Sequence, residues 1–200
     1  MRLRRVGLQR LGGRSNLIFT RSFITSPAQP FLCLYLNPIS KIKMDDNKAK
    51  FQEISIAPMH TAEHLLNQTM VRMFGCERSN NAHIERKKSK IAYTLDKCPS
   101  EETLYVIVDK MNELIDADLP VYEEYAEISR IPASISLKKL PEGTGSTIRL
   151  VHIGNYDVCP CIGLHAKSTK ELGHFHLLGT NWNEETKSFR IRFKLDIVEQ

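Results

Sequence analysis

The chain has 200 residues, of which 42% are hydrophobic and 26% are charged, and these values are ordinary for one globular domain with or without a tail. No apolar run reaches the roughly 18 residues that a membrane-spanning helix needs. The formal charge of +5 comes from residues 1–43, which hold six Arg and two Lys without an acid, so that residues 44–200 carry −3 and overall basicity is no argument for a nucleic-acid partner.

The first segment, residues 1–43, is rich in Arg and Ser and is typical of a mitochondrial transit peptide. In a second interpretation it lies upstream of the true start, because Met44 opens a mixture of acidic and basic residues that is typical of a folded domain. Under either interpretation we expect residues 1–43 to be a disordered basic extension and residues 44–200 to form the domain. The protein is then expected in the cytoplasm, or in the mitochondrial matrix if the segment is a transit peptide.

Two helices are predicted in the domain. From Met59 to Phe74 the apolar residues recur with a period near 3.6, Pro58 suits the first turn, and Gly75 is a typical stop. A second helix is predicted over residues 103–118, because a Pro-Ser-Glu-Glu start signal precedes apolar residues at helical spacing and a Leu-Pro pair ends them. Each helix has one apolar side suited to burial.

Five strands are predicted around and after these helices, over residues 89–95, 121–129, 147–153, 173–178 and 188–198. The last of them alternates apolar and charged residues, so we expect one of its faces to be buried and the other exposed. The stretch PEGTGS at 141–146 is a turn signal. A few helices with mostly antiparallel strands indicate an α+β fold.

The cysteines are odd in number and irregular in spacing, which argues against a disulfide framework and for a reducing compartment. They are Cys33, Cys76, Cys98, Cys159 and Cys161. One of them, Cys161, lies four residues before His165.

Two pairs of potential metal ligands lie far apart in the sequence. His60 and His64 are one helical turn apart, so their rings can face one point, and Cys161 and His165 repeat the spacing. Either pair alone is a weak signal, because a histidine pair on a helix is more often an ordinary polar pair. Three imidazoles and one thiolate together form a set that tetrahedral zinc accepts, whereas Mg²⁺ and Ca²⁺ prefer oxygen ligands, so the conjunction predicts a Zn²⁺ site.

The residues around these pairs extend the pattern. HTAEHLL at 60–66 is followed by MNELIDADLPV at 111–121, and then by a C-x-x-x-H segment and STKELG at 161–173. In this order they resemble the editing domain shared by alanyl- and threonyl-tRNA synthetases, their second additional domain, and the free-standing AlaX-type alanyl-tRNA editing proteins. The resemblance covers most of residues 56–197 and implies a mostly antiparallel sheet packed with a few helices.

Three positions depart from the pattern of the family. The usual Cys-Gly-Gly-Thr-His is here Cys-Ile-Gly-Leu-His, so Ile162 replaces a glycine and Leu164 replaces a hydroxyl residue. Cys159 adds a competing thiol two residues before Cys161, although the spacing to His165 favours Cys161 as the ligand.

The resemblance implies a trans-editing deacylase, which hydrolyses the ester between a wrong amino acid and the terminal ribose of tRNA. Ser-tRNA(Ala) is the leading substrate, because a synthetase pocket rejects a near-isostere poorly. The implied cofactor is Zn²⁺, which either lowers the pKa of a bound water molecule or only orients the ester. Its implied ligands are His60, His64, Cys161 and His165.

Four further residues are expected near the site. Glu63 and Asn67 are expected to shape the pocket beside the ligands. Because Leu164 carries no hydroxyl, Thr61 or a backbone group is expected to hydrogen-bond the serine side chain. Asp157 is a candidate partner for the second nitrogen of a ligand histidine, or else a turn residue. The remaining histidines are expected to be structural, namely His83, His152, His174 and His176.

The implied partner is the 3′ acceptor end of mischarged tRNA, and nothing in the sequence indicates a membrane or an obligate protein partner. Candidate phosphate contacts are the cations of ERKKSK at 85–90, Lys138 and Lys139, and Arg190, Arg192 and Lys194 on one face of the last strand. Three alternatives stay open: a Ser-tRNA(Thr) deacylase, a noncatalytic zinc-stabilised tRNA-binding module, and a metallohydrolase of small esters or amides.

Overall fold

The computed structural model describes residues 53–137, 140 and 144–196, all of which belong to one compact unit, Ile42–Gln200. The predictions for residues 1–43 and 138–139, and for the first part of the turn at 141–146, lie outside the described residues. None of the helices that the structure describes is long and apolar enough to cross a lipid bilayer.

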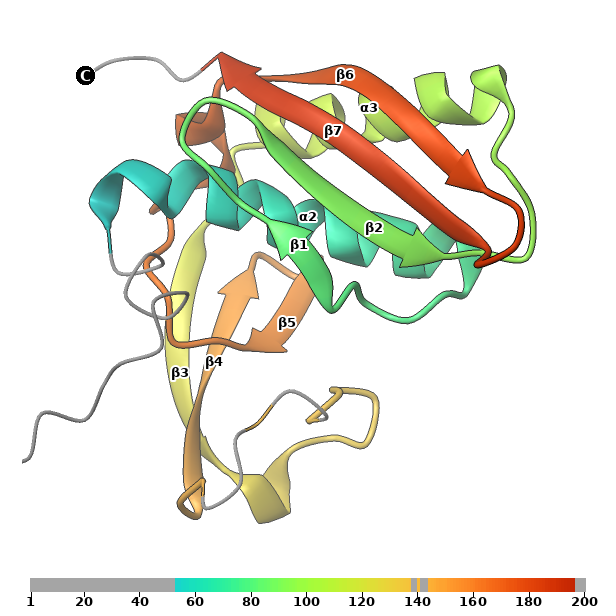
Figure 1. Cartoon of the computed structure of the whole chain (residues 1–200). Coiled ribbons are helices and arrows are strands. Elements are labelled where there is room, and N and C mark those ends of the chain that lie inside the picture. Colours follow the sequence, from blue (N-terminus) through green and yellow to red (C-terminus); the bar gives the residue numbers. More distant parts are fainter. Residues whose placement is uncertain (1–52, 138–139, 141–143, 197–200) are drawn as a thin grey trace, which may run out of the picture. The chain divides into compact units, whose positions relative to one another are not determined.

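Helix α2, Ala57–Phe74, carries the first histidine pair (Figure 1). A short 3-10 turn, η1 Ile54–Ile56, leads into it, and Pro58 lies in its first turn, where a missing N–H breaks no helical hydrogen bond. Gly75 ends the helix with a φ of 64°, and its N–H donates to the carbonyl of Val71. The predicted helix is confirmed, with a start two residues earlier.

Helix α3, Glu101–Asp116, packs against α2. The Ser100 hydroxyl accepts the N–H of Thr103 at 3.3 Å, and two glutamates in the first turn face the positive end of the helix dipole. Its buried side consists of apolar residues at helical spacing, namely Ile107, Met111, Leu114 and Ile115. This predicted helix is also confirmed, but the acidic start signal itself forms the first turn.

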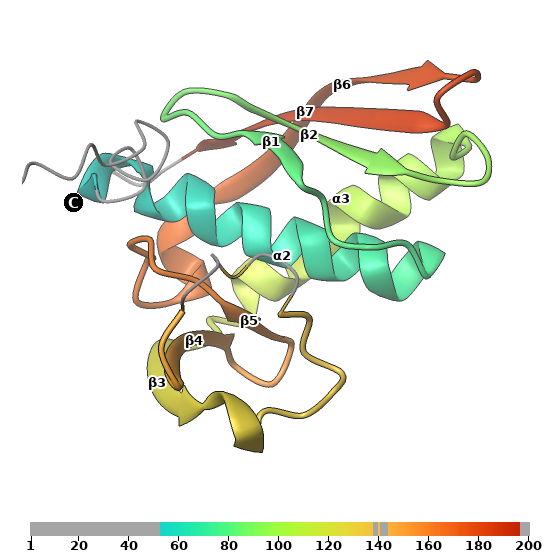
Figure 2. The same ribbon diagram turned by 60° about the horizontal axis from the view of Figure 1, so that its bottom comes forward.

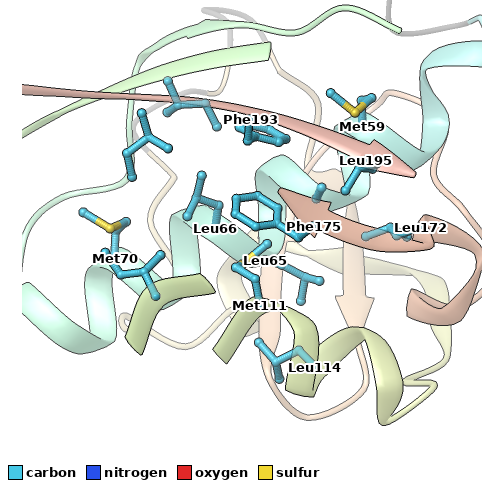
Figure 3. Packing of buried hydrophobic residues seen from close by; sticks show 14 of the residues in the cluster. Met59, Leu65, Leu66, Met70, Met111, Leu114, Leu172, Phe175, Phe193 and Leu195 are labelled. Atoms are coloured by element: carbon cyan, nitrogen blue, oxygen red, sulfur yellow. The ribbon is translucent and has the colours of Figure 1, made fainter. Parts of the chain in front are cut away.

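A four-stranded antiparallel sheet lies on one side of the two helices (Figure 1, Figure 2). In spatial order its strands are β1 Asn81–His83, β2 Ser89–Thr94, β7 Ser188–Asp196 and β6 His174–Asn183. Strand β7 alternates buried and exposed residues as predicted, and its inward Phe193 stacks on Phe175 of β6 with ring centres 5.1 Å apart. Apolar side chains from both helices and from the inner face of this sheet form one core (Figure 3).

A smaller antiparallel sheet lies on the other side of α2 (Figure 2). In spatial order its strands are β3 Val121–Glu127, β4 Thr147–Ile153 and β5 Asp157–Pro160. A 3-10 turn, η2 Ile128–Arg130, follows β3, and another, η3 Thr169–Leu172, precedes β6. Helix α2 therefore lies between the two sheets, with one side in the apolar core and another side against β5.

Several strands differ from their sequence-based predictions. Strand β3 ends at Glu127 and not at residue 129, because the chain turns into η2 there. Strand β6 runs on to Asn183, because a β-bulge between Leu177 and Gly179 breaks the alternation by which a strand is recognised. Strands β1 and β5 were not predicted, since three and four residues are too few to show a period. The α+β prediction, with mostly antiparallel strands and a few helices, is confirmed.

Candidate metal centre

Four potential ligand atoms converge where the loop after β5 approaches α2. His60 and His64 lie one turn apart on α2, Cys161 follows β5 directly, and His165 lies in the loop between β5 and η3. One ligand atom from each of the four side chains lies within 4.8 Å of the others. The structure therefore brings together the two pairs that are separated in the sequence.

Two of the distances between these atoms match the edges of a tetrahedral metal site. Sγ of Cys161 lies 3.5 Å from Nε2 of His60, and Nε2 of His165 lies 3.3 Å from Nε2 of His64. With zinc–nitrogen bonds of about 2.0–2.1 Å and a zinc–sulfur bond of about 2.3 Å, a tetrahedron has N···N edges of about 3.3–3.4 Å and N···S edges of about 3.6 Å. The donor types and these two distances make the group compatible with metal binding.

Two of the three imidazoles are oriented by contacts on their far nitrogen. Nδ1 of His60 donates to the carbonyl of Leu164 at 3.0 Å, which leaves Nε2 toward Cys161. Nδ1 of His64 lies 3.4 Å from Oδ2 of Asp157. Contacts of this kind hold a ligand ring in place and raise its basicity, so Asp157 lies where an outer partner of a ligand histidine is expected.

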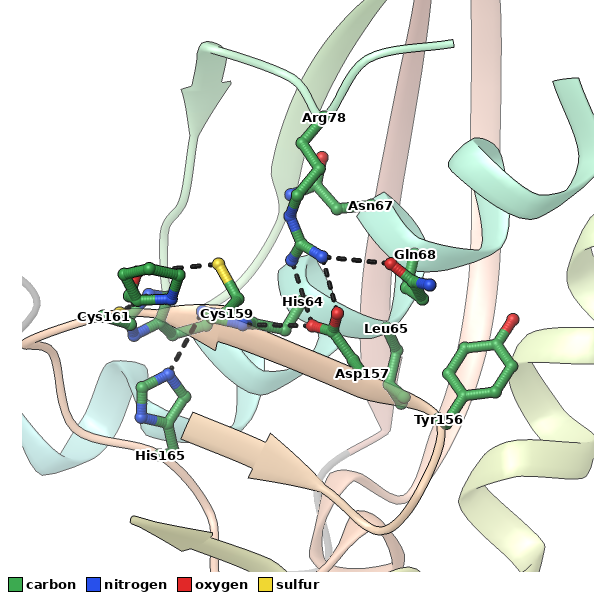
Figure 4. A network of polar contacts seen from close by, with 12 residues as sticks. His64, Leu65, Asn67, Gln68, Arg78, Tyr156, Asp157, Cys159, Cys161 and His165 are labelled. Atoms are coloured by element: carbon green, nitrogen blue, oxygen red, sulfur yellow. Dashed lines mark hydrogen bonds and ion pairs between the residues drawn. The ribbon is translucent and has the colours of Figure 1, made fainter. Parts of the chain in front are cut away.

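Asp157 is a buried carboxylate whose charge is balanced by Arg78 (Figure 4). The guanidinium contact is bidentate, with Nη1 2.6 Å from Oδ1 and Nη2 3.0 Å from Oδ2. Burial alone would raise the pKa of Asp157, but the contacts with His64 and Arg78 lower it, so the carboxylate stays ionised. Asn67 on α2 accepts the N–H of Ser79 at 2.9 Å and thereby fixes the segment that carries Arg78.

The electrostatics of the group suit metal ligands. Burial alone would raise the pKa of the Cys161 thiol, but contacts from the three histidines lower that pKa to about 2. Burial lowers the pKa of His165 to about 4. Burial would also lower the pKa of His64, but Asp157 and Cys161 raise it well above its ordinary value. Cys161 is thus a thiolate and His165 a neutral imidazole at neutral pH, and a metal ion would displace the proton held by His64.

Thr61 ties the loop that carries Cys161 and His165 to helix α2. Its hydroxyl donates to the carbonyl of Ala57 at 2.9 Å and accepts the N–H of Ala166 at 3.0 Å, and its side chain is fully buried. Because the single hydroxyl proton is used within α2, Thr61 has none left to donate to a substrate. The structure therefore gives Thr61 a positioning role beside the ligands.

Arg149 on β4 makes a second tie to the same loop and was not singled out from the sequence. Its Nε donates to the carbonyl of Cys161 at 2.7 Å, and its Nη2 donates to the carbonyl of Gly163. The carbonyl of Arg149 accepts the N–H of Cys161 at 3.2 Å, and its Nη1 contacts Glu123 at 2.8 Å. Arg149 thus holds the chain around Cys161, and no motif marks it because the contact depends on the pairing of β4 with β5.

A cavity of about 700 Å³ opens beside the converging ligands. Its volume lies in the range of small-molecule sites, roughly 300–1,000 Å³. His60, His64 and Cys161 line one part of it. The remaining wall mixes apolar and polar side chains, among them Tyr125, Thr147, Ile148 and Arg149. The cavity therefore leaves space for a small molecule beside these three side chains.

The other predicted pocket residues are placed differently from one another. Asn67 lines the cavity. Glu63 is half-buried and is not one of the described residues that line it. Of the two substitutions between Cys161 and His165, Ile162 lines the cavity with 59% of its surface exposed. Leu164 acts through its carbonyl on His60.

Cys159 and the other histidines stay outside the four-residue group. Cys159 lines the cavity, but its Sγ is directed to the carbonyl of Pro160 at 3.5 Å, and it is not one of the converging ligands. Three of the other histidines contact carboxylates, in the pairs His83–Glu85, His152–Glu124 and His176–Asp196. The ring of His174 lies 4.6 Å from that of His176.

Residues 148–192 match the family described as the threonyl and alanyl tRNA synthetase second additional domain. This segment runs from β4 into β7 and contains Cys161 and His165. The first histidine pair lies upstream of it, on α2.

Alanine–tRNA ligases and an editing protein are similar to a longer part of the chain. The alanine–tRNA ligase of Leptospira biflexa is 29% identical over 131 residues, which cover 62% of this chain and 14% of the ligase. The alanyl-tRNA editing protein AlaX-L of Pyrococcus horikoshii is 32% identical over 126 residues, which cover 60% of this chain and 29% of AlaX-L. The alanine–tRNA ligase of Methylacidiphilum infernorum is 30% identical over 128 residues, which cover 62% of this chain and 14% of the ligase.

The chain thus spans less than a third of the length of each of these relatives. The resemblance expected from the motifs is confirmed, because the family model matches and the relatives include alanine–tRNA ligases and AlaX-L. The segment from β4 into β7 thus matches the threonyl and alanyl tRNA synthetase second additional domain, and the chain is similar to alanine–tRNA ligases and to AlaX-L.

Proposed function

We propose that the protein is a zinc-dependent, trans-acting deacylase of mischarged aminoacyl-tRNA, with Ser-tRNA(Ala) as its principal substrate. The observation that carries the proposal is the convergence of His60, His64, Cys161 and His165 beside a cavity, in a chain related to an alanyl-tRNA editing protein. Editing is needed because a synthetase pocket built for one small amino acid discriminates only by roughly 10²-fold against an analogue with one added hydroxyl.

Zinc is the proposed metal because a thiolate with three imidazoles suits a borderline-soft ion. When bound, the ion would supply Lewis acidity toward the ester or lower the pKa of a water molecule toward 7. The chain orients its ligands for this purpose. The carbonyl of Leu164 directs His60, the carboxylate of Asp157 faces His64, and Arg149 holds the loop around Cys161.

The cavity wall supplies features for selecting a small hydroxylated amino acid. Ile148 and Ile162 provide apolar surface, and Thr147 provides a hydroxyl within the same wall. Since the proton of Thr61 is used on Ala57, we assign recognition of the serine hydroxyl to Thr147 or to a backbone group. A site that hydrogen-bonds this hydroxyl would spare correctly charged Ala-tRNA(Ala).

The test is a deacylation assay on the full chain with its metal content measured in parallel. Ser-tRNA(Ala), Ser-tRNA(Thr) and Ala-tRNA(Ala) are offered at equal concentration. We expect about one zinc ion per chain and the fastest hydrolysis for Ser-tRNA(Ala). The His64→Ala variant should lose hydrolysis while its circular dichroism spectrum stays unchanged.

The other outcomes identify the competing functions. Faster hydrolysis of Ser-tRNA(Thr) would move the specificity to that substrate. Tight tRNA binding without hydrolysis would support a noncatalytic zinc-stabilised tRNA-binding module. Hydrolysis of small esters or amides without any activity on charged tRNA would support a small-molecule metallohydrolase.

We further propose a cytoplasmic location, or the mitochondrial matrix if residues 1–43 direct import. The proposal rests on the composition of that segment, which is rich in Arg and lacks acids. Fractionation of cells that express the full chain or residues 44–200 distinguishes the two. Enrichment in the matrix that depends on residues 1–43 would select the second location.

A further inference from the structure

The outer face of the four-stranded sheet carries cations that the metal centre does not use. Strands β2 and β7 bury alternate residues, so Lys90, Arg190 and Arg192 point away from the core and are exposed. The register places Lys90 directly opposite Arg192. The exposed tip of the hairpin between β1 and β2 adds Arg86, Lys87 and Lys88.

Two acids border this group, and among the described residues they form ion pairs with other side chains; Glu85 contacts His83 at 2.7 Å. The acid at an outward position of β7, Asp196, contacts Lys194 at 2.9 Å and His176 at 2.6 Å. None of the ion pairs between described residues involves Lys90, Arg190 or Arg192. The excess positive charge of this face is therefore local, on a portion of the chain, residues 44–200, whose formal charge is −3.

The sheet holds this charge at a cost to its own stability. Two cations directly opposite each other on adjacent strands, as Lys90 and Arg192 are, repel one another. The sheet also makes room for one of them. Gly179, beside the bulge in β6, lies opposite Arg192 with a φ of 146°, and a Cβ at that glycine would come within 3.2 Å of the Arg192 guanidinium. An arrangement that is unfavourable in the isolated sheet indicates a polyanionic partner.

We propose that this cationic face, Lys90, Arg190 and Arg192 with the hairpin tip 86–88, binds the phosphate backbone of a base-paired part of the tRNA. Helices α2 and α3 cover the opposite face of the sheet, and no helix or strand of the described residues covers this one (Figure 2). The outward positions of β2 and β7 hold no Phe, Tyr or Trp, so these two strands offer charge without aromatic side chains on which bases would stack. Such a surface suits a duplex backbone better than unpaired bases.

The identity of this RNA as tRNA rests on the proposed function, whereas the preference for a polyanion rests on the face alone. The cationic face lies on the side of the helices away from the smaller sheet (Figure 2). In this proposal the face contacts the body of the RNA, and the cavity on the other side of the helices receives the charged 3′ end. Phosphate contacts made here would set affinity and orientation and would carry no sequence preference.

The test compares the tRNA affinity of three full-length proteins. They are the wild type, the triple variant Lys90→Gln/Arg190→Gln/Arg192→Gln, and a control, Lys97→Gln/Arg130→Gln/Lys170→Gln, that removes three exposed cations outside this sheet. All three keep residues 1–43, whose cations contribute equally. We expect the triple variant to bind tRNA about tenfold or more weakly at physiological salt, with the slope of log K against log salt reduced by about 2–3 because each phosphate contact contributes about 0.9.

The control is expected to stay within about twofold of the wild type, since charges remote from the RNA are screened. Equal affinities of the triple variant and the control would overturn the proposal. So would binding to phosphatidylserine vesicles that the triple variant loses while its tRNA affinity is retained, because that result would assign the face to a lipid surface.

A second substrate separates this proposal from the proposed function. Serine esterified to a short 3′ CCA oligonucleotide reaches the cavity without a duplex, so its hydrolysis should be the same in the triple variant and the wild type. If the wild type hydrolyses neither this oligonucleotide nor charged tRNA, the deacylase function fails, and the comparison of tRNA affinities still decides the docking face.

Discussion

The two halves of the candidate metal centre are held in place in different ways. His60 and His64 lie on α2, where main-chain hydrogen bonds set the distance between residues four apart and the buried side of the helix anchors it in the core. Cys161 and His165 lie in a loop, where no such repeat exists. Their positions depend on contacts from the guanidinium of Arg149 and the hydroxyl of Thr61.

This difference indicates where the centre is most easily disturbed. A helix places a ligand through many equivalent hydrogen bonds, so the loss of one contact has little effect on the others. The loop depends on a few long-range hydrogen bonds, each worth about 0.5–1.5 kcal/mol net, or more when the donor is charged. We therefore expect that substituting a residue that binds no metal displaces the ligands of the loop half more readily than those of the helix half.

Removal of a ligand from either half is expected to have the largest effect. His64→Ala and Cys161→Ala each leave three donors, so zinc should fall from about one ion per chain to near zero, and deacylation should fall to the uncatalysed rate. Elemental analysis and the deacylation assay measure the two quantities. His83→Ala, in an exposed pair with Glu85, is the control and should change neither. Full activity of a metal-free His64→Ala protein would exclude a metal-dependent reaction.

Loss of the outer partner on the helix side should have the next largest effect. In Asp157→Asn the contact with His64 weakens and the charge of Arg78 is left without its partner. We expect about 10- to 100-fold weaker zinc binding and a free energy of unfolding lower by about 3–5 kcal/mol. Competition with a chelator and urea unfolding measure these changes. Glu85→Gln breaks an exposed pair and should cost less than about 1 kcal/mol, so an equal cost for both would contradict the assigned role of Asp157.

Weakening the guanidinium tie tests the loop half directly. Arg149→Met removes the donors to Cys161 and Gly163, so we expect zinc affinity to fall about tenfold, near the lower end of the range for outer partners. Arg149→Lys keeps a cation with different geometry and should restore only part of that loss. The absorption spectrum of the cobalt-substituted protein reports whether the thiolate binds the metal. A change elsewhere in the fold would leave this spectrum unchanged. An unchanged cobalt spectrum and zinc affinity in Arg149→Met would show that Cys161 is held by other contacts.

The smallest effect is expected from the hydroxyl tie. Thr61→Val keeps the shape of the side chain but leaves the N–H of Ala166 without its acceptor, so the free energy of unfolding should fall by about 1–2 kcal/mol. Thr61→Ser keeps the hydroxyl and should retain most of this stability. Urea unfolding of both variants with zinc in excess measures the difference. If the two variants are equally stable, the contact with Ala166 does not stabilise the loop.

Much of the secondary structure was predictable because its signals are local. Helices α2 and α3 and strand β7 follow from apolar residues at a constant spacing, which arises from the backbone geometry of each element. Strand β5 is only four residues long, so it showed no such spacing, although it leads directly to Cys161. The bulge before Gly179 ended the predicted β6 too early for a similar reason.

For the site, residue order alone establishes the donor types and their spacing. Zinc can be expected from these donors because its preference for imidazole and thiolate depends only on side-chain chemistry. Folding establishes which residues surround those donors. Arg78 contacts Asp157 across 79 positions of the chain, and Arg149 contacts Cys161 across 12. The carbonyl of Leu164 contacts His60 across 104 positions. Long-range hydrogen bonds of this kind leave no periodic trace, since each depends on how separate elements pack.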